Sequence, residues 1–235
     1  MQRLSDTSVG ALPAAVARPA YDRKALKTGI VHLGIGAFMR AHMAAATEAA
    51  IAAGDMRWGI TGVSLRQADT RDALAPQDGL YTLAIRDADA QGQPRQRLQV
   101  IGAVRKLLVA PESPQAVMDA IAATDTRIVS LTVTEKGYCH DPATGALRLD
   151  HPDVVFDLAH PDTPRSAIGM LVYGLQLRHA QGHGPLTLMS MDEVPWLYRD
   201  GTLPEGVRIA GPSIEILRQH PHYVARVQSM GNEVH

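Results

Sequence analysis

The fold is decided by the stretch GIVHLGIGAFMRAH, residues 29–42, which an alanine-rich segment follows. A short apolar run, two glycines and helix-forming residues predict a strand, a tight turn and a helix. Gly34 and Gly36 would let the backbone approach a pyrophosphate, and the N–H groups of the next helix would donate to it. Met39 stands where the usual fingerprint has a third glycine. The pattern predicts the phosphate-binding corner of a dinucleotide-binding fold; the alternative is that the glycines only close a tight turn.

A second strand is predicted at WGITGVSL, residues 58–65, after a helix from Arg40 to Ala53 and a break at Gly54-Asp55. Strand, glycine turn, helix and strand within about 35 residues form the βαβ unit that the motif requires. We therefore predict an α/β fold with a doubly wound, mostly parallel sheet of the Rossmann type.

The rest of the chain divides into three parts. Residues 1–28 are rich in proline and alanine and predict a surface arm, residues 29–195 a dinucleotide-binding domain, and residues 196–235 a short irregular tail. Within the domain and the tail, apolar patterns predict further elements. The expected strands are 80–86, 98–104, 127–133 and 186–191, and the expected helices are 114–123, 166–179 and, in the tail, 213–219.

Composition narrows the possible partners and compartment. A formal net charge of −1 and 4% aromatic residues give no sign of nucleic-acid binding, which favours basic surfaces and stacking side chains. No apolar run reaches the length of a membrane span, and no signal peptide is recognisable, so we expect a cytoplasmic protein without membrane association. The single cysteine, Cys139, fits a reducing compartment. His179 and His183 have metal-ligand spacing but sit where a helix ends, so no metal site is predicted.

Polar side chains near the predicted strand ends are the candidate ligand contacts. Arg40 has the chemistry to bind a phosphate as a forked donor, or it is a solvated helix residue. The run TVTEKGY, residues 132–138, leaves the carboxyl end of a strand, where open α/β sheets bind ligands; the alternative is an ordinary polar loop. Asp69 is expected on the ribose 2′-hydroxyl and favours NAD, although Arg66 would suit a 2′-phosphate.

The motif around the glycines resembles the Gly-x-Gly-x-Phe-x-Arg-Ala-His signature of the mannitol dehydrogenase family, the polyol-specific long-chain dehydrogenases. Further stretches match the family in the same order along residues 30–192. They are QDGLYT at 77–82, SLTVTEKGY at 130–138, PATG at 142–145, DHP at 150–152 and PRSA at 164–167. The stretch from 135 to 145 is most similar to the fructuronate reductases, which are D-mannonate oxidoreductases.

The resemblance implies an NAD-dependent oxidoreductase that transfers hydride between NAD(H) and a polyol or hexuronate, with D-mannonate and D-fructuronate as the expected pair. The nicotinamide would carry the redox chemistry. No catalytic residue is assigned, and a small sugar acid or polyol is the expected partner. The residues expected to bind the cofactor are Gly34, Ile35, Gly36, Ala37, Phe38, Arg40, Asp69, Thr134 and Glu135.

Two departures from the family pattern bear on activity. The family has Ser-Cys-Asp-Asn-hydrophobic-Pro where this chain reads SMDEVP at 190–195, so that Glu193 replaces an asparagine of the substrate or catalytic site. An ionised carboxylate there would disfavour the negative charge that develops on a carbonyl oxygen during reduction. The family's helical domain, with its lysine general acid/base, has no counterpart within residues 196–235. The alternative to an active enzyme is a truncated, catalytically inactive NAD-binding module or an interaction protein.

Overall fold

The computed structural model describes residues 3–88, 91–132, 137, 139, 141, 143–144, 147–184, 186–190 and 208–209. The helix expected at 213–219 and most of the expected tail therefore lie outside the described residues. Among the helices that are described, none combines the length and the apolar character needed to cross a membrane.

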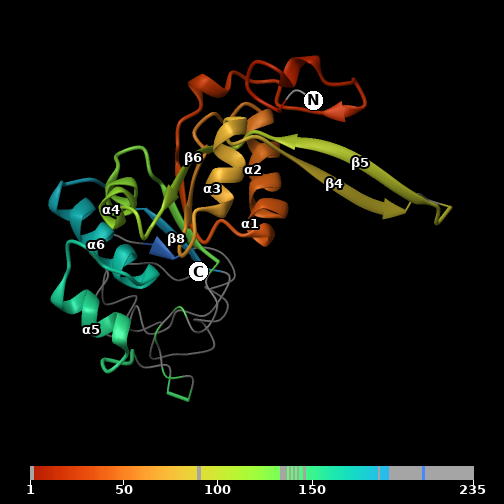
Figure 1. The fold of residues 1–235 in the computed structure, drawn as a ribbon. Helices are drawn as coiled ribbons and strands as arrows, with labels where there is room; N and C mark the ends of the chain where they lie inside the picture. Colours follow the sequence, from red (N-terminus) through yellow and green to blue (C-terminus); the bar gives the residue numbers. More distant parts are fainter. Residues whose placement is uncertain are drawn as a thin grey trace.

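A six-stranded parallel sheet forms the centre of the molecule (Figure 1). Its strand order is β6-β3-β2-β7-β8-β9, so the chain starts in the middle, builds outward to β6, and then crosses back to the other side of β2. This confirms the doubly wound Rossmann-type prediction. The strands are β2 (Ile30–Leu33), β3 (Ile60–Ser64), β6 (Val104–Val109), β7 (Ile128–Leu131), β8 (Thr187–Ser190) and β9 (Arg208–Ile209).

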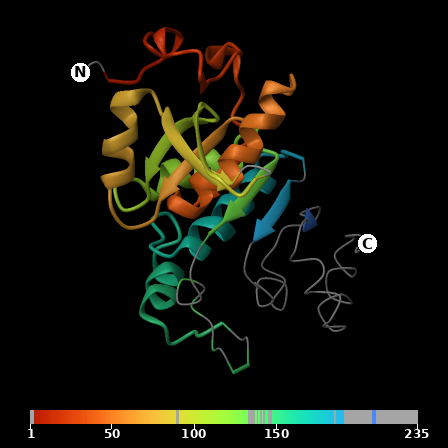
Figure 2. The ribbon, with the colours of Figure 1, turned by 90° about the vertical axis from the view of Figure 1, so that its right-hand side faces the viewer.

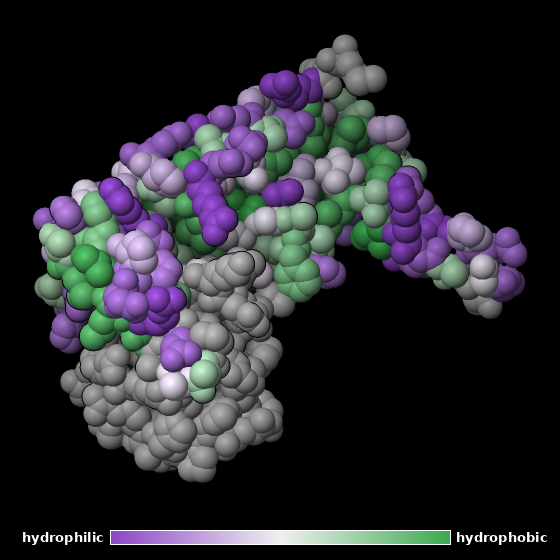
Figure 3. Space-filling view, turned by 60° about the horizontal axis from the view of Figure 1, so that its bottom comes forward, coloured by the Kyte–Doolittle hydropathy of each residue, from purple (hydrophilic) through white to green (hydrophobic). Residues whose placement is uncertain are grey.

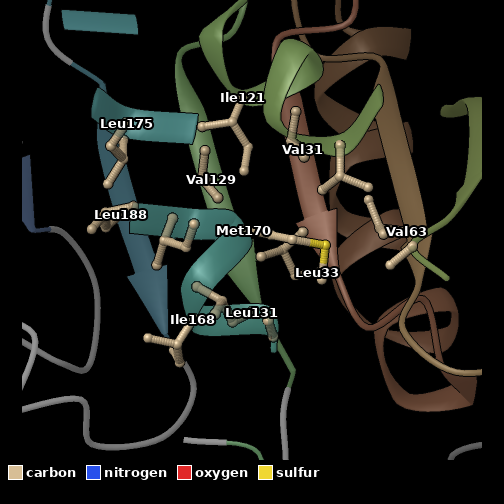
Figure 4. Close-up of a cluster of buried hydrophobic side chains, with 14 of the residues drawn as sticks. Val31, Leu33, Val63, Ile121, Val129, Leu131, Ile168, Met170, Leu175 and Leu188 are labelled. Carbon is tan, nitrogen blue, oxygen red and sulfur yellow. The ribbon is translucent and has the colours of Figure 1, made fainter. Parts of the chain in front are cut away.

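Helices cover both faces of this sheet (Figures 1 and 2). On one face, apolar residues of α4 and α6 pack on alternate residues of the central strands, among them Val31, Leu33 and Val129 (Figure 4). On the other face, Met39, Ile51 and other apolar residues of α1, α2 and α3 pack together. The helices are α1 (Ala37–Ala41), α2 (Met43–Ala52), α3 (Asp69–Leu74), α4 (Pro114–Ala122), α5 (Pro152–Ala159) and α6 (Ala167–Ala180).

A second, three-stranded sheet with the order β1-β5-β4 projects from the body. It consists of β1 (Val16–Ala17) and the antiparallel hairpin of β4 (Tyr81–Ala88) and β5 (Pro94–Ile101). Hydrophilic side chains cover much of the outer part of this hairpin (Figure 3). The strand expected at 98–104 is wrong as a single element, because the chain ends β5 at Ile101 and enters the central sheet as β6 at Val104.

Two further expectations are corrected by the structure. The single helix expected from Arg40 to Ala53 begins earlier, at Ala37, and is interrupted at His42, whose φ of −112° and ψ of −70° depart from helical values. Helices α3 and α5 were not expected from the sequence. They have only six and eight residues and bury one and two of them, so they leave little apolar periodicity.

The N-terminal arm is anchored more firmly than a surface arm would be. Arg23, only 5% exposed, donates hydrogen bonds to the carbonyl oxygens of Gly102 (3.0 Å), Asp78 (2.8 Å) and Val104 (3.1 Å). Its guanidinium also pairs with Asp6. The arm thus holds the β4–β5 hairpin to the edge of the central sheet through one buried cation, which periodicity alone does not reveal.

Candidate functional site

A cavity of about 550 Å³ lies at the carboxyl edge of the central sheet, within the size range of small-molecule sites. The glycine turn at 34–36 forms one part of its wall, and residues 64–67 with Thr70, after β3, form another. Thr132 after β7, the loop residues Gly137 and Cys139, and Asp153 with residues 165–167 complete the lining. The structure thus brings together the sequence-predicted glycine turn and the end of β7.

Gly34 is required by the fold itself. Its φ is +104°, in the region that favours glycine, and a Cβ there would stand 2.5 Å from the carbonyl oxygen of Thr132. The next side chain, Ile35, turns into the core and occupies the space left by Gly62 on β3, where a Cβ would overlap its Cδ1. The turn after β2 therefore fits between the end of β7 and Gly62 of β3. This packing brings the backbone of Gly34 and Ile35 to the cavity wall.

Gly36 faces open space. Its φ of −76° suits any residue, and among the described residues a Cβ built on it would meet only the carbonyl oxygen of Gly34, at 3.8 Å. It is exposed and lines the cavity as the N-cap of α1, whose first N–H groups have no acceptors within the helix. A Cβ at Gly36 would occupy the space between the turn and the first N–H groups of α1. A pyrophosphate could enter that space and accept hydrogen bonds from these N–H groups. The residues present fit a dinucleotide.

Behind the turn lies a buried polar chain between β2 and β7. His32, 1% exposed, hydrogen-bonds Ser130 Oγ through Nδ1 at 2.7 Å and Thr132 Oγ1 through Nε2. The Thr132 hydroxyl also donates to the Gly34 carbonyl oxygen at 3.2 Å. Burial lowers the pKa of His32 to about 4, so the ring is neutral at physiological pH. The neutral His32 ring thus hydrogen-bonds Thr132, which in turn hydrogen-bonds the glycine turn. The sequence pattern did not indicate these contacts.

Arg40 and Phe38 do not line the cavity. Arg40 donates from Nη1 to the Ile35 carbonyl oxygen at 2.8 Å, and the Tyr81 hydroxyl donates to the Arg40 carbonyl oxygen at 2.7 Å. Phe38 is 50% exposed, with its ring 4.5 Å from that of His42. Arg40 therefore supports the turn from behind, and any contribution of Phe38 or Ala37 to ligand binding would come from the backbone of the first helical turn.

The wall after β3 is polar but carries no acid. Ser64 is the buried last residue of the strand, and Arg66, Gln67 and Thr70 line the cavity beyond it. Asp69, expected on the ribose, is the exposed first residue of α3 and is not among the lining residues. The structure therefore brings Arg66, but not Asp69, to the cavity.

Another part of the cavity wall, around residues 165–167, is held by the buried carboxylate of Asp157 in α5. This carboxylate accepts hydrogen bonds from the backbone N–H groups of Arg165 (2.6 Å) and Ser166 (3.2 Å) and from the Ser166 hydroxyl (2.5 Å). Ser166 also caps α6 by accepting from the Gly169 N–H at 2.8 Å. The Arg165 guanidinium lies 3.4 Å from the centre of the Phe156 ring. The sequence did not single out Arg165 as a candidate ligand contact, although its motif at 164–167 was noted.

Cys139, His151 and Asp153 bring three potential metal ligands within 4.8 Å of one another beside the cavity. The His151 Nδ1 already accepts the Asp153 N–H at 3.2 Å as the cap of α5. Burial, together with Asp153 and Asp157, raises the pKa of the Cys139 thiol to about 11, which disfavours the thiolate that metals bind. The absence of a metal site stays a prediction from the sequence. Thr134, Glu135, Lys136 and Glu193 lie outside the described residues.

Comparison with known proteins extends this picture. The sequence profile of the mannitol dehydrogenase Rossmann domain matches residues 28–197. A mannitol dehydrogenase of Saccharomyces cerevisiae (DSF1) is 42% identical over 183 residues, 75% of this chain and 35% of that protein. The D-mannonate oxidoreductase of Escherichia coli is 42% identical over 184 residues, 76% of this chain and 37% of that protein.

Solved structures agree in fold. Mannitol 2-dehydrogenase of Pseudomonas fluorescens, in a ternary complex with NAD and D-mannitol, superposes with a TM-score of 0.76 at 32% identity, covering 97% of this chain and 45% of that one. A substrate-free D-sorbitol dehydrogenase gives a TM-score of 0.75 at 30% identity. The chain therefore spans little more than a third of the curated relatives and just under half of the solved structures.

Proposed function

We propose that this chain, which belongs to the mannitol dehydrogenase family, binds NAD(H) and serves an oxidoreductase that acts on a secondary alcohol of a polyol or sugar acid. The observation that carries the proposal is Gly36, an exposed glycine that opens onto the cavity beside the first turn of α1. Such a cradle suits the pyrophosphate of a dinucleotide.

Each part of the proposed cofactor site has a physical role. The backbone of residues 34–38 would hold the pyrophosphate, with Arg40 and Tyr81 bracing the turn from behind. The bound nicotinamide would supply the hydride acceptor or donor. Thr132, Thr134 and Glu135 would contact the cofactor at the end of β7, and the exposed Asp69 at the start of α3 is our candidate for the ribose hydroxyl.

For the substrate we propose a hexuronate pair, D-mannonate and D-fructuronate, rather than a neutral polyol. The support is Arg165, which lines the cavity and lies over the Phe156 ring, whereas its backbone N–H is held by Asp157. A guanidinium that lies over an aromatic ring is well suited to bind a carboxylate through two parallel hydrogen bonds. D-Mannitol has no carboxylate and would leave this arginine without an anionic partner.

The test is binding to the full 235-residue chain. We expect NADH to bind in a fluorescence titration, and the chain saturated with NAD⁺ to bind D-mannonate more tightly than D-mannitol in calorimetry. Arg165→Met, which keeps the length of the side chain but removes the charge, should weaken D-mannonate binding about tenfold or more and leave NADH binding unchanged. Arg97→Met, on the projecting hairpin, is the matched control.

The outcomes separate the parts of the proposal. A folded chain that binds no NADH would contradict the cofactor assignment. Equal binding of D-mannonate and D-mannitol, or no effect of Arg165→Met, would contradict the hexuronate assignment alone. Steady-state NADH oxidation with D-fructuronate, measured on the same samples, then distinguishes an active enzyme from a module that binds NADH without turnover.

A further inference from the structure

The N–H groups of the glycine turn donate to different acceptors. Gly34 and Ile35 both donate to the carbonyl oxygen of Val63 on β3, at 3.0 and 3.1 Å, which fixes this part of the turn to the sheet. The Gly36 N–H instead donates to the Gly34 carbonyl oxygen, at 2.6 Å, and closes a turn of three residues. Gly36 is exposed and lines the cavity. Its N–H is therefore the first donor of the turn that a cofactor could recruit, and the Gly34 carbonyl oxygen competes for it.

The Gly34 carbonyl oxygen has a second donor. The hydroxyl of Thr132, at the end of β7, donates to it at 3.2 Å. A carbonyl oxygen has two lone pairs and can accept both hydrogen bonds. When the Gly36 N–H turns toward a ligand, the Thr132 hydroxyl keeps this oxygen paired, so the turn avoids the cost of an unsatisfied acceptor.

The direction of the hydrogen bonds behind Thr132 follows from this acceptor. A carbonyl oxygen only accepts, so the single hydrogen of the Thr132 hydroxyl belongs to the bond with Gly34. The Thr132 oxygen then accepts from His32, which places the proton of the neutral ring on Nε2. Nδ1 is therefore an acceptor, and the Ser130 hydroxyl donates to it at 2.7 Å in preference to the weak acceptor Met43 Sδ at 3.5 Å. The chain of donors runs from Ser130 to the glycine turn.

His32 occupies a place in this chain from which it cannot contact a ligand. Its side chain is 1% exposed, and it is not among the described residues that line the cavity, whereas Thr132 is. Any effect of His32 on ligand affinity must therefore pass through Thr132 and the turn. This distinguishes orientation of the turn from a direct contact, which Thr132 alone could also make.

We propose that His32 and Thr132 are positioning residues for the pyrophosphate of the cofactor. The Thr132 hydroxyl, oriented by His32, holds the Gly34 carbonyl oxygen and leaves the Gly36 N–H free to donate to a phosphate oxygen. This inference rests on the proposed function, because it concerns NAD(H) at the same glycine turn. It adds that two residues behind the turn set its affinity for the cofactor.

The test measures the affinity of the full chain for NADH by fluorescence titration and for ADP by calorimetry. Thr132→Val removes the hydroxyl at nearly constant shape and should weaken NADH binding about tenfold, because the Gly36 N–H is no longer released to a charged acceptor. ADP contains the pyrophosphate but no nicotinamide, and its affinity should fall by a similar factor. Thr132→Ser keeps the hydroxyl and should bind NADH within about threefold of the wild type.

Two variants of His32 test its part in the chain. The amide of His32→Gln reaches about as far as Nε2, so it can donate to Thr132 and should keep NADH affinity within about threefold. The amide of His32→Asn reaches only about as far as Nδ1, so it can pair with Ser130 but not with Thr132, and NADH binding should weaken about fivefold. Adding His32→Asn to Thr132→Val should weaken binding little further, because both changes break one chain.

Thr126→Val is the matched control. Thr126 is 2% exposed, and its hydroxyl donates to the Ala120 carbonyl oxygen at 2.7 Å, away from the cavity. This variant loses the same kind of buried hydrogen bond, so it should be less stable in urea denaturation, while its NADH affinity stays within about twofold of the wild type. Urea denaturation of every variant verifies that it is folded.

The failure of this inference is distinct from that of the proposed function. An NADH affinity that Thr132→Val leaves unaltered, or that Thr126→Val lowers equally, would overturn the positioning role while the dinucleotide site stands. A loss seen for NADH but not for ADP, or an unaltered NADH affinity of a folded His32→Asn variant, would overturn it as well. If His32→Asn does not fold, the comparison of Thr132→Val with Thr132→Ser decides. A folded wild-type chain that binds no NADH would overturn both proposals.

Discussion

The two sides of the glycine turn obey different constraints. On the interior side, Gly34 packs against the backbone of Thr132, and both ring nitrogens of His32 hydrogen-bond to hydroxyl groups. On the cavity side, the Gly34 carbonyl oxygen is the only atom of the part of the chain that the structure describes within 4 Å of a Cβ added to Gly36. Two glycines one residue apart thus have different reasons to be glycine. Packing requires the glycine on the interior side, and the cofactor that we propose requires the glycine on the cavity side.

The largest effect is expected at Gly34. Gly34→Ala places a Cβ 2.5 Å from a backbone oxygen at a φ of +104°, and we expect the free energy of unfolding to fall by about 3 kcal/mol or more. Urea denaturation measures it. Gly54→Ala is the matched control, since Gly54 has a φ of +108° and no described atom lies within 4 Å of an added Cβ, so it isolates the backbone cost of about 1 kcal/mol. Equal losses for the two variants would show that the contact with Thr132 is unimportant.

His32 gives the interior side a pH dependence. An unfolded histidine titrates near 6.5, and burial lowers the pKa of His32 to about 4, so the unfolded chain binds more protons between these values. The free energy of unfolding should therefore fall as the pH drops from 6.5 toward 4, by about 3 kcal/mol from this group. His32→Gln, which keeps a neutral hydrogen-bonding side chain, should lose that slope in denaturation curves recorded across the range.

Another buried group acts in the opposite direction. Burial raises the pKa of Glu48, so its contribution to stability is lost as the pH rises above its ordinary value of 4.5. Glu48 is present in both the wild-type and the His32→Gln proteins, so the difference between their slopes reports His32 alone. Identical slopes in the two proteins would mean that the ring is not enclosed as described.

On the cavity side, we expect a substitution to change ligand binding strongly and the free energy of unfolding little. Gly36→Val fills the open cradle and should weaken NADH binding about 100-fold or more, because a pyrophosphate loses its charged hydrogen bonds to the turn. Stability should change by less than about 1 kcal/mol, since the backbone there suits any residue. Titration and urea denaturation of one sample test both statements, and an unchanged NADH affinity would remove the glycine turn from the site.

The smallest effect is expected at Phe38. Its side chain is half exposed and does not line the cavity, whereas its backbone N–H belongs to the first turn of α1. Phe38→Ala keeps that N–H, so NADH affinity should stay within about threefold of the wild type and stability within about 1 kcal/mol. A large loss of affinity would mean that the ring, and not only the backbone, contacts the cofactor.

The candidate site was predictable where chemistry follows from neighbours along the chain. Gly34 and Gly36 stand in a strand–turn–helix pattern, and that pattern alone located the turn. Arg66 and Asp69 were both candidates for the ribose because spacing cannot say which side chain faces the sheet edge. Arg165 and Asp157 were not predicted, because the hydrogen bonds between them join α5 to the start of α6 and leave no periodic signal.

By itself, the sequence determined the class of fold, the order of the main strands and the position of the glycine turn. These depend on local propensity and on the period of apolar residues along the chain. Only the tertiary structure decided that Gly34 is held by Thr132, that Arg23 anchors the N-terminal arm, and that Arg66 rather than Asp69 lines the cavity. Each of these is a contact between segments far apart in the chain, and packing, not pattern, selects it.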